Sequence, residues 1–400
     1  MAGTRRRSVA VPGLDALLAS KEMLVVCGSG GTGKTTISAA LGAIAARDLG
    51  ARVLVLTVDP ARRLATALGL GEAGFGNVEV EVDPALLHAG AAAGSSAGQL
   101  WVAMLDTKAG WDELIRRHAP DAAVRDQVLA NPLYHNITSR FVHSHDYLAM
   151  ERLHEVHASG RFDLVVVDTP PSRNALALLD APARMKEFFG SRLLRWLTVP
   201  YRSRLFTAAS RPFYQVADRV LGSRFLQDIA EFFVLFQTME QGFVGRADQV
   251  ERLLVDPRSS FVVVSTLEAA PAHEAAYLAR ELQSRQMPLG AVVVNRALPQ
   301  RLRQPAAAAS ARQLRTVAER RDLVATLAAL VGADEAEVGN VLSEVGGRFA
   351  DIAVVASRES ERRAELEALG VLTVAAPTLG RDVTDLPALL ELGDHLLRPR

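Results

Sequence analysis

Short, nearly uninterrupted apolar runs recur along the chain, separated by longer segments with apolar residues at helical spacing. Valine- and leucine-rich runs without polar breaks are typical of strands that are buried on both faces of a parallel sheet. Their alternation with helical segments predicts a doubly wound, mainly parallel α/β fold. The predicted strands are residues 24–26, 52–58, 101–105, 162–168, 261–266, 291–295, 352–356 and 371–375.

Helices are predicted where apolar positions repeat about every 3.6 residues. The first predicted helix follows a glycine-rich turn and buries Ile37, Leu41 and Ile44. In two long stretches, about 101–157 and 182–252, the helical pattern dominates. We interpret these stretches as a helical subdomain inserted into a single domain that spans residues 1–400. Further helices are predicted at 61–68, 305–329 and 385–397.

The stretch 23–36, MLVVCGSGGTGKTT, joins the first predicted strand to the first predicted helix. Gly28, Gly33, Lys34 and Thr35 fit the phosphate-binding loop pattern of Gly, four residues, Gly, Lys and Ser or Thr. Glycines let backbone N–H groups turn toward phosphate oxygens, and the helix directs its N-terminus at the same anion. Lys34 would reach the β- and γ-phosphates, and the Thr35 hydroxyl would hold Mg²⁺. Because the pattern lies between a strand and a helix, we favour nucleoside triphosphate binding over a chance match.

Two aspartates follow predicted strands. Asp168 ends the run 162–168, as in a Walker-B strand that delivers a carboxylate to the Mg²⁺ site. Asp59 follows the run 52–58, at the end of the strand where ligands bind in open α/β sheets. Asp59 also precedes Pro60 and can cap the helix predicted at 61–68, and the two roles are compatible.

A stripe of large apolar residues at helical spacing runs through the second helical stretch. Packing between inserted helices explains most of the stripe, because large apolar side chains are usually buried. The alternative is a hydrophobic groove for a helical client, exposed in one nucleotide state. The stripe consists of Phe225, Ile229, Phe232, Phe236, Met239 and Phe243.

The amino-acid composition argues against several classes of protein. Hydrophobic residues make up 49% of the chain, which suffices for a large core, and 45 basic residues balance 45 acidic ones. This balance argues against a broad nucleic-acid surface, and we expect no nucleic-acid partner. The single cysteine, Cys27, allows no internal disulfide, and we interpret it as a small apolar strand residue. Because no export signal or membrane-length apolar stretch is present, we expect a cytoplasmic protein.

Taken together, the motifs make the sequence similar to the arsenical-pump and guided-entry ATPase family, in particular its bacterial single-site members. This family lies within the deviant-Walker group of P-loop NTPases that includes the MinD and ParA partition ATPases. The resemblance implies the P-loop NTPase fold. The matching pieces are residues 28–36, 57–64, 131–137, 147–153, 166–182, 231–236, 294–296 and 382–389.

The resemblance implies a role for each matching position. Asn295 would read the adenine, and Pro377 would lie near the base. The implied catalytic residues are Asp59, which would orient or activate the attacking water, Lys34 and Asp168. The implied metal site comprises Thr35, Asp59 and Asp168. The full set of implied nucleotide contacts is Gly28, Ser29, Gly30, Gly31, Thr32, Gly33, Lys34, Thr35, Thr36, Asn295 and Pro377.

Members of the family act as nucleotide-sandwich dimers whose opening and closing remodel a helical subdomain. The resemblance therefore implies a Mg²⁺-dependent ATPase switch, with ATP and Mg²⁺ as cofactors and a hydrophobic helical client or membrane protein as partner. It also implies either a homodimer or a heterodimer with a paralogous ATPase.

The sequence departs from the family pattern at three points. The signature lysine, which reaches the partner's phosphates across the dimer, is Ser29 here. An alternative function is therefore a weakly hydrolysing regulatory subunit of a heteromer, whose paralogous partner supplies the lysine. The zinc-binding Cys-x-x-Cys and the metalloid-sensing cysteines are also absent. We expect no zinc, and an arsenite-efflux ATPase is the less favoured function because trivalent metalloids need thiolate ligands.

Overall fold

The computed structural model describes residues 13–58, 68, 77–88, 98–131, 134, 144–170, 175–191, 232–317 and 319–398. Within these residues, eight strands form one sheet in the order β3-β4-β2-β5-β1-β6-β7-β8. Only β3, at one edge, runs antiparallel to its neighbour, and the other pairs are parallel. The strands are β1 (Met23–Gly28), β2 (Arg52–Thr57), β3 (Val80–Glu81), β4 (Gln99–Met104), β5 (Leu164–Asp168), β6 (Ser259–Ser265), β7 (Leu289–Ala297) and β8 (Leu372–Pro377).

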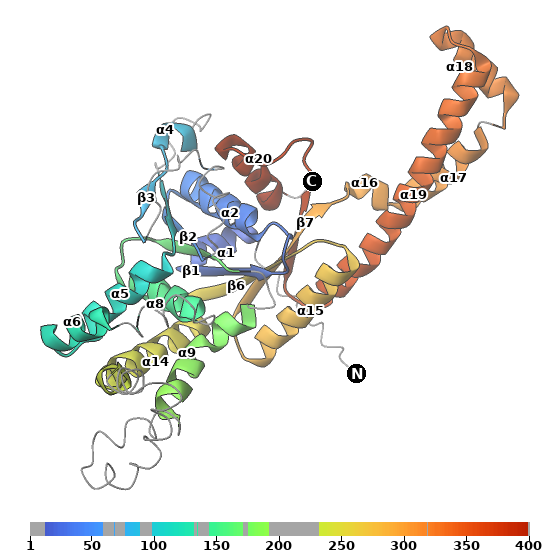
Figure 1. Cartoon of the computed structure of the whole chain (residues 1–400). Coiled ribbons are helices and arrows are strands. Elements are labelled where there is room, and N and C mark those ends of the chain that lie inside the picture. Colours follow the sequence, from blue (N-terminus) through green and yellow to red (C-terminus); the bar gives the residue numbers. More distant parts are fainter. Residues whose placement is uncertain are drawn as a thin grey trace, which may run out of the picture.

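Helices cover both faces of the sheet (Figure 1). One face carries α1 (Leu14–Ser20), α2 (Lys34–Leu49) and α20 (Leu386–Leu397), with α4 (Pro84–Leu87) beside them. Successive residues of β1 point to opposite sides, so Val25 belongs to one apolar core and Leu24 to the other. The predicted doubly wound α/β fold is confirmed, and α2 buries Ile37, Leu41 and Ile44 as expected.

A layer of helices covers the opposite face. It comprises α5 (Thr107–His118), α6 (Ala122–Ala130), α8 (Ser144–Ala158), α9 (Ala175–Gly190), α14 (Glu240–Val255) and α15 (Ala269–Ser284). β4 confirms the strand predicted at 101–105, and the helices of the stretch 101–157 begin after it, at Thr107. The division of the chain into a domain and an inserted subdomain stays a prediction.

Aromatic side chains form the core of this layer. Phe189 and Phe236 stack with their ring centroids 5.3 Å apart, and both rings also contact Phe243. The described members of the predicted stripe, Phe232, Phe236, Met239 and Phe243, are all buried, as the packing interpretation expects. Phe225 and Ile229 lie outside the described residues.

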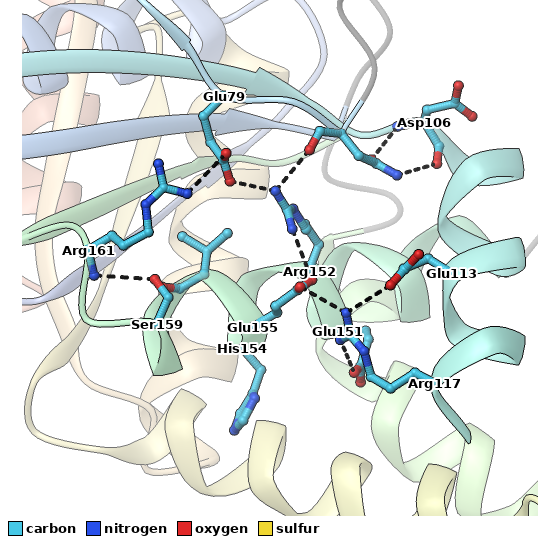
Figure 2. Close-up of polar contacts among 12 residues, drawn as sticks. Glu79, Asp106, Glu113, Arg117, Glu151, Arg152, His154, Glu155, Ser159 and Arg161 are labelled. Atoms are coloured by element: carbon cyan, nitrogen blue, oxygen red, sulfur yellow. Dashed lines mark hydrogen bonds and ion pairs between the residues drawn. The ribbon is translucent and has the colours of Figure 1, made fainter. Parts of the chain in front are cut away.

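Ion pairs connect the helical layer with the edge of the sheet (Figure 2). Arg152 on α8 lies 2.6 Å from Glu79, next to β3, and 3.0 Å from Glu155. Arg117 on α5 lies 2.9 Å from the same Glu155. These contacts join α5, α8 and the β3 edge, which are distant in sequence.

The C-terminal part of the chain contains the main error of the sequence prediction. Residues 352–356, expected as a strand, lie within the 33-residue helix α19 (Glu335–Glu367). The run of apolar residues at 352–356 is too short for its periodicity to distinguish a strand from a helix. α19 starts where the Asp334 carboxylate accepts hydrogen bonds from the backbone N–H groups of Ala336 and Glu337.

The helix predicted at 305–329 is divided into two helices. α16 (Gln300–Arg303) precedes them, α17 (Pro305–Val317) packs along α19, and α18 (Arg321–Val331) ends at Gly332 in the left-handed conformation. Together α17, α18 and α19 form an arm that extends from the body (Figure 1). In the described part of the chain, no helix combines the length and apolar character that crossing a membrane requires.

Candidate functional site

The loop between β1 and α2 is held in a shape that depends on glycine. Gly28, Gly31 and Gly33 have φ angles of 148°, 78° and 89°, a region that L-residues rarely adopt. A Cβ on Gly28 would also lie 2.1 Å from the carbonyl oxygen of Val264 in β6. The glycine pattern therefore serves both the backbone conformation and the close approach of the neighbouring strand.

Hydrogen bonds inside the loop keep it compact. The Thr32 hydroxyl donates to the Ser29 carbonyl at 2.9 Å, and the Asn295 amide donates to the Thr32 carbonyl at 2.8 Å. The Lys34 ammonium group donates to the Ser29 carbonyl at 3.0 Å, so this buried side chain folds back over the loop. This position places its positive charge beside the backbone groups and the helix N-terminus that would face a phosphate.

Asp168 lies at the carboxyl end of β5, between β1 and β2, and is fully buried. Its Oδ2 accepts hydrogen bonds from the hydroxyls of Thr35, at 2.6 Å, and Thr57, at 3.1 Å. The Thr35 hydroxyl, at the start of α2, and the Asp168 carboxylate, at the end of β5, are hard oxygen donors of the type that Mg²⁺ prefers. The residues present therefore fit a Mg²⁺ ion next to the glycine loop.

Ser29, at the position of the missing lysine, is turned toward α15. Its hydroxyl donates to the Glu274 carboxylate at 2.5 Å, and the side chain is 6% exposed. This short neutral side chain therefore supplies no positive charge to the loop.

The two predicted nucleoside contacts lie near the carboxyl ends of the neighbouring strands β7 and β8 but differ in their surroundings. Pro377 lines an open cavity of about 1010 Å³ together with Ala297, Arg301, Arg363 and His395. Asn295 is 6% exposed, and its side-chain amide already donates a hydrogen bond to the Thr32 carbonyl of the loop. The cavity is large enough for a nucleoside.

Cys27 lies on β1 immediately before the loop. Its thiol is buried and donates to the Val262 carbonyl at a distance of 3.7 Å. Burial raises the pKa of this thiol to about 12, although Lys34 opposes the shift. A thiol that stays protonated is a poor nucleophile, which agrees with the interpretation of Cys27 as a strand residue.

Several predicted residues lie outside the described residues. These are Asp59, the helix predicted at 61–68 apart from Leu68, and the segment 171–174 that follows β5. The predicted roles of the site residues, Gly30 and Thr36 among them, stay predictions.

Sequence reasoning missed two residues at the site. Thr57 could have been found, because it is a polar residue at the carboxyl end of a buried strand, where the side chains of a site gather. Glu274 gives no local signal, because it is a half-buried residue of the ordinary helix α15, 245 residues from Ser29.

Comparison with known proteins agrees with this geometry. The sequence model of the anion-transporting ATPase family matches residues 21–321. A relative from Streptomyces coelicolor, the uncharacterized protein SCO2128, is 30% identical over 238 residues, which cover 58% of this chain and 54% of the relative. The chain thus spans about half the length of this relative. Since the family match covers most of the chain and includes the glycine loop, Asp168 and Asn295, the chain belongs to the anion-transporting ATPase family.

Proposed function

We propose that this protein is a Mg²⁺-dependent ATPase that works as a dimeric switch in the cytoplasm. The observation that carries the proposal is the contact between Thr35 and Asp168 at the start of α2, directly beside the glycine loop. A phosphate-binding loop, a metal-binding hydroxyl and a strand-end carboxylate are the parts that P-loop ATPases use for phosphoryl transfer.

The residues have distinct roles in this proposal. The N–H groups of Gly31, Thr32 and Gly33 bind phosphate oxygens, and Lys34 moves from the Ser29 carbonyl to the β- and γ-phosphates. Thr35 and Asp168 hold Mg²⁺, which would neutralise charge that develops on the phosphates. Asp59 orients or activates the attacking water. Pro377 and Asn295 bind the adenine.

The helical layer is the part that would respond to the nucleotide. The Thr169 hydroxyl, next to Asp168, donates to the Val26 carbonyl at 2.9 Å, and the chain then leads into α9 at Ala175. α9 packs against α8 and α14. A displacement beside Asp168 would therefore reach the helices, through which we propose that the dimer engages a helical client or membrane protein.

Nucleotide binding and turnover of the purified chain test this function. Lys34→Ala should weaken ATP binding by about tenfold or more, because it removes the charge that contacts the phosphates. Asp59→Asn should retain binding but abolish turnover. Lys21→Ala is the matched control, since Lys21 precedes β1 at the end remote from the loop and donates to the Pro257 carbonyl. Unchanged binding in Lys34→Ala would contradict the proposal.

The contact of Ser29 with Glu274 favours a second candidate, a regulatory subunit that binds ATP but hydrolyses it weakly. In this case a paralogue supplies the missing lysine across a heterodimer. Ser29→Lys should then raise turnover without the paralogue by about tenfold or more when two copies of the variant form the dimer, because a charge that contacts the transferred phosphate lowers the barrier. Ser29→Gln, of similar length but neutral, should not. Vigorous turnover by the wild-type chain alone would exclude the regulatory subunit.

A further inference from the structure

The arm carries an apolar surface that the proposed ATPase site does not explain. α17 packs along one side of α19, where Gly346 and Ala356 are buried and Leu342, Phe349 and Ala353 are half-buried. A second stripe on α19 remains in contact with solvent. Val341, Val345, Ile352 and Val355 on this stripe are 54%, 49%, 40% and 49% exposed. Four large apolar side chains along one line of a helix are more than the scattered exposure of an ordinary surface.

The stripe has the spacing of a coiled-coil seam. We define the α19 seam as Val338, Val341, Val345, Arg348, Ile352 and Val355. Successive members are three and four residues apart, which is the a and d pattern of heptads, and β-branched residues fill every a position. The seam spans about 26 Å of helix at a rise of about 1.5 Å per residue. A surface of this pattern fits another helix with an apolar seam of similar length.

We propose that the α19 seam binds the same seam of a second copy of this chain, with the two helices antiparallel. When Val345 packs against Arg348 of the second copy, Val341 packs against Ile352 and Val338 against Val355. Each seam position then has a partner, and the same contacts recur on both sides of the two-fold axis.

The outermost charged pair beside the seam favours this arrangement. Exposed charged residues flank the seam at every seventh position: Glu337, Glu344, Asp351 and Arg358. In the antiparallel pairing, Glu337 lies opposite Arg358 of the second copy. Glu344 lies opposite Asp351, a pair of like charges, but Arg348 already pairs with Glu344 on its own helix at 2.6 Å, which offsets the repulsion. A parallel pairing in register would instead place Arg348 against Arg348, and like charges at a seam oppose association.

This association is distinct from the nucleotide-driven dimer under "Proposed function". The seam lies on the arm, which extends away from the body that contains the glycine loop (Figure 1). Association through the seam should therefore occur without ATP and persist in Lys34→Ala. A loss of ATP binding would therefore contradict the ATPase proposal alone, and a loss of association without ATP would contradict the seam proposal alone.

Sedimentation equilibrium of the full chain without nucleotide, over a hundredfold range of concentration, tests the proposal. Wild-type protein should associate reversibly to a dimer, and Val355→Glu should weaken the dimer by about tenfold or more, because it buries a charge in the seam. Val354→Glu is the matched control, since Val354 is adjacent and 53% exposed but lies off the seam. Far-UV circular dichroism should show equal helix content in the two variants.

A charge exchange tests the orientation. Glu337→Arg and Arg358→Glu should each weaken the dimer, and the double variant should restore it, because each copy then presents the reversed pair. A wild-type chain that stays monomeric at every concentration would overturn the proposal and leave the seam to a helix of another protein. Equal association of Val355→Glu and Val354→Glu would overturn it too, and failure of the double variant to recover would overturn the antiparallel pairing.

Discussion

The glycines of the loop 28–33 differ in what prevents a side chain at each position. Gly31 has a φ of 78°, but no atom lies within 4 Å of the place that a Cβ would occupy, so only the backbone conformation is costly for another residue. At Gly28 the φ of 148° is combined with a direct collision with the Val264 carbonyl oxygen. That oxygen belongs to the backbone of a central strand and cannot yield without moving the sheet.

Substitution by alanine should separate these two causes. We expect Gly31→Ala to lower the free energy of unfolding by about 1 kcal/mol, which is the cost of the left-handed conformation alone. Gly28→Ala should lower it by about 3 kcal/mol, because β1 and β6 must also separate. Urea unfolding monitored by circular dichroism measures both values. Equal losses would mean that the collision at Gly28 is relieved at little cost.

At the scale of elements, the helical layer has polar groups inside its aromatic core. His118, at the end of α5, has its ring centroid 5.0 Å from that of Phe243, and its Nε2 is buried without a hydrogen bond among the described residues. Burial lowers the pKa of His118 to about 4, and the positive charges of Arg246 and Arg117 add to the effect. The layer is therefore built around a neutral imidazole.

This histidine should make the protein less stable in acid. Because its native pKa lies below the ordinary 6.5, its contribution is complete above pH 6.5 and is lost as the pH falls through 4. His118→Phe removes the titrating group but keeps a ring against Phe243. We expect the variant to lose about 2 kcal/mol less free energy of unfolding than wild type between pH 6.5 and pH 4.

Urea unfolding at a series of pH values provides the measurement. Glu151 in the same layer also titrates, because burial raises its pKa to about 7. It is present in both proteins, so its effect on stability cancels in the comparison. The comparison therefore isolates His118. The same acid dependence in wild type and His118→Phe would show that the imidazole is protonated freely in the folded state.

At the scale of the whole molecule, the sheet brings the parts of the site together. The ends of β1, β2 and β5 place the glycine loop, Thr57 and Asp168 side by side, although these residues are far apart in sequence. A ligand held by several elements stabilises the native state as a whole, since the unfolded chain has no such arrangement.

MgATP should therefore raise the free energy of unfolding by about 2.7 kcal/mol at a hundredfold excess over its dissociation constant. Chelation of Mg²⁺ by EDTA should remove part of this gain. Thr35→Val should lack the Mg²⁺-dependent part, because it deletes the hydroxyl that contacts Asp168. Thr326→Val, at an exposed threonine on α18, is the matched control. A wild-type chain whose melting temperature is the same with ATP, with MgATP and with neither would contradict nucleotide binding at this site.

The sequence by itself determined the features that depend on near neighbours. The buried strands of the sheet, the glycine loop, the lysine and threonine that follow it, and the aspartate at the end of β5 were all predicted, because burial on both faces and left-handed turns restrict the residues at those positions. The family followed from the order of these motifs along the chain, and the family match confirmed it.

Only the tertiary structure decided which distant residues meet. The contacts of Ser29 with Glu274 and of Thr57 with Asp168 depend on the packing of α15 and the order of the strands, which no local pattern encodes. The same limit explains residues 352–356, where β-branched residues fit either a strand or a helix. They are helical because α19 packs along α17 over a long surface, and this packing leaves most of the α19 seam exposed.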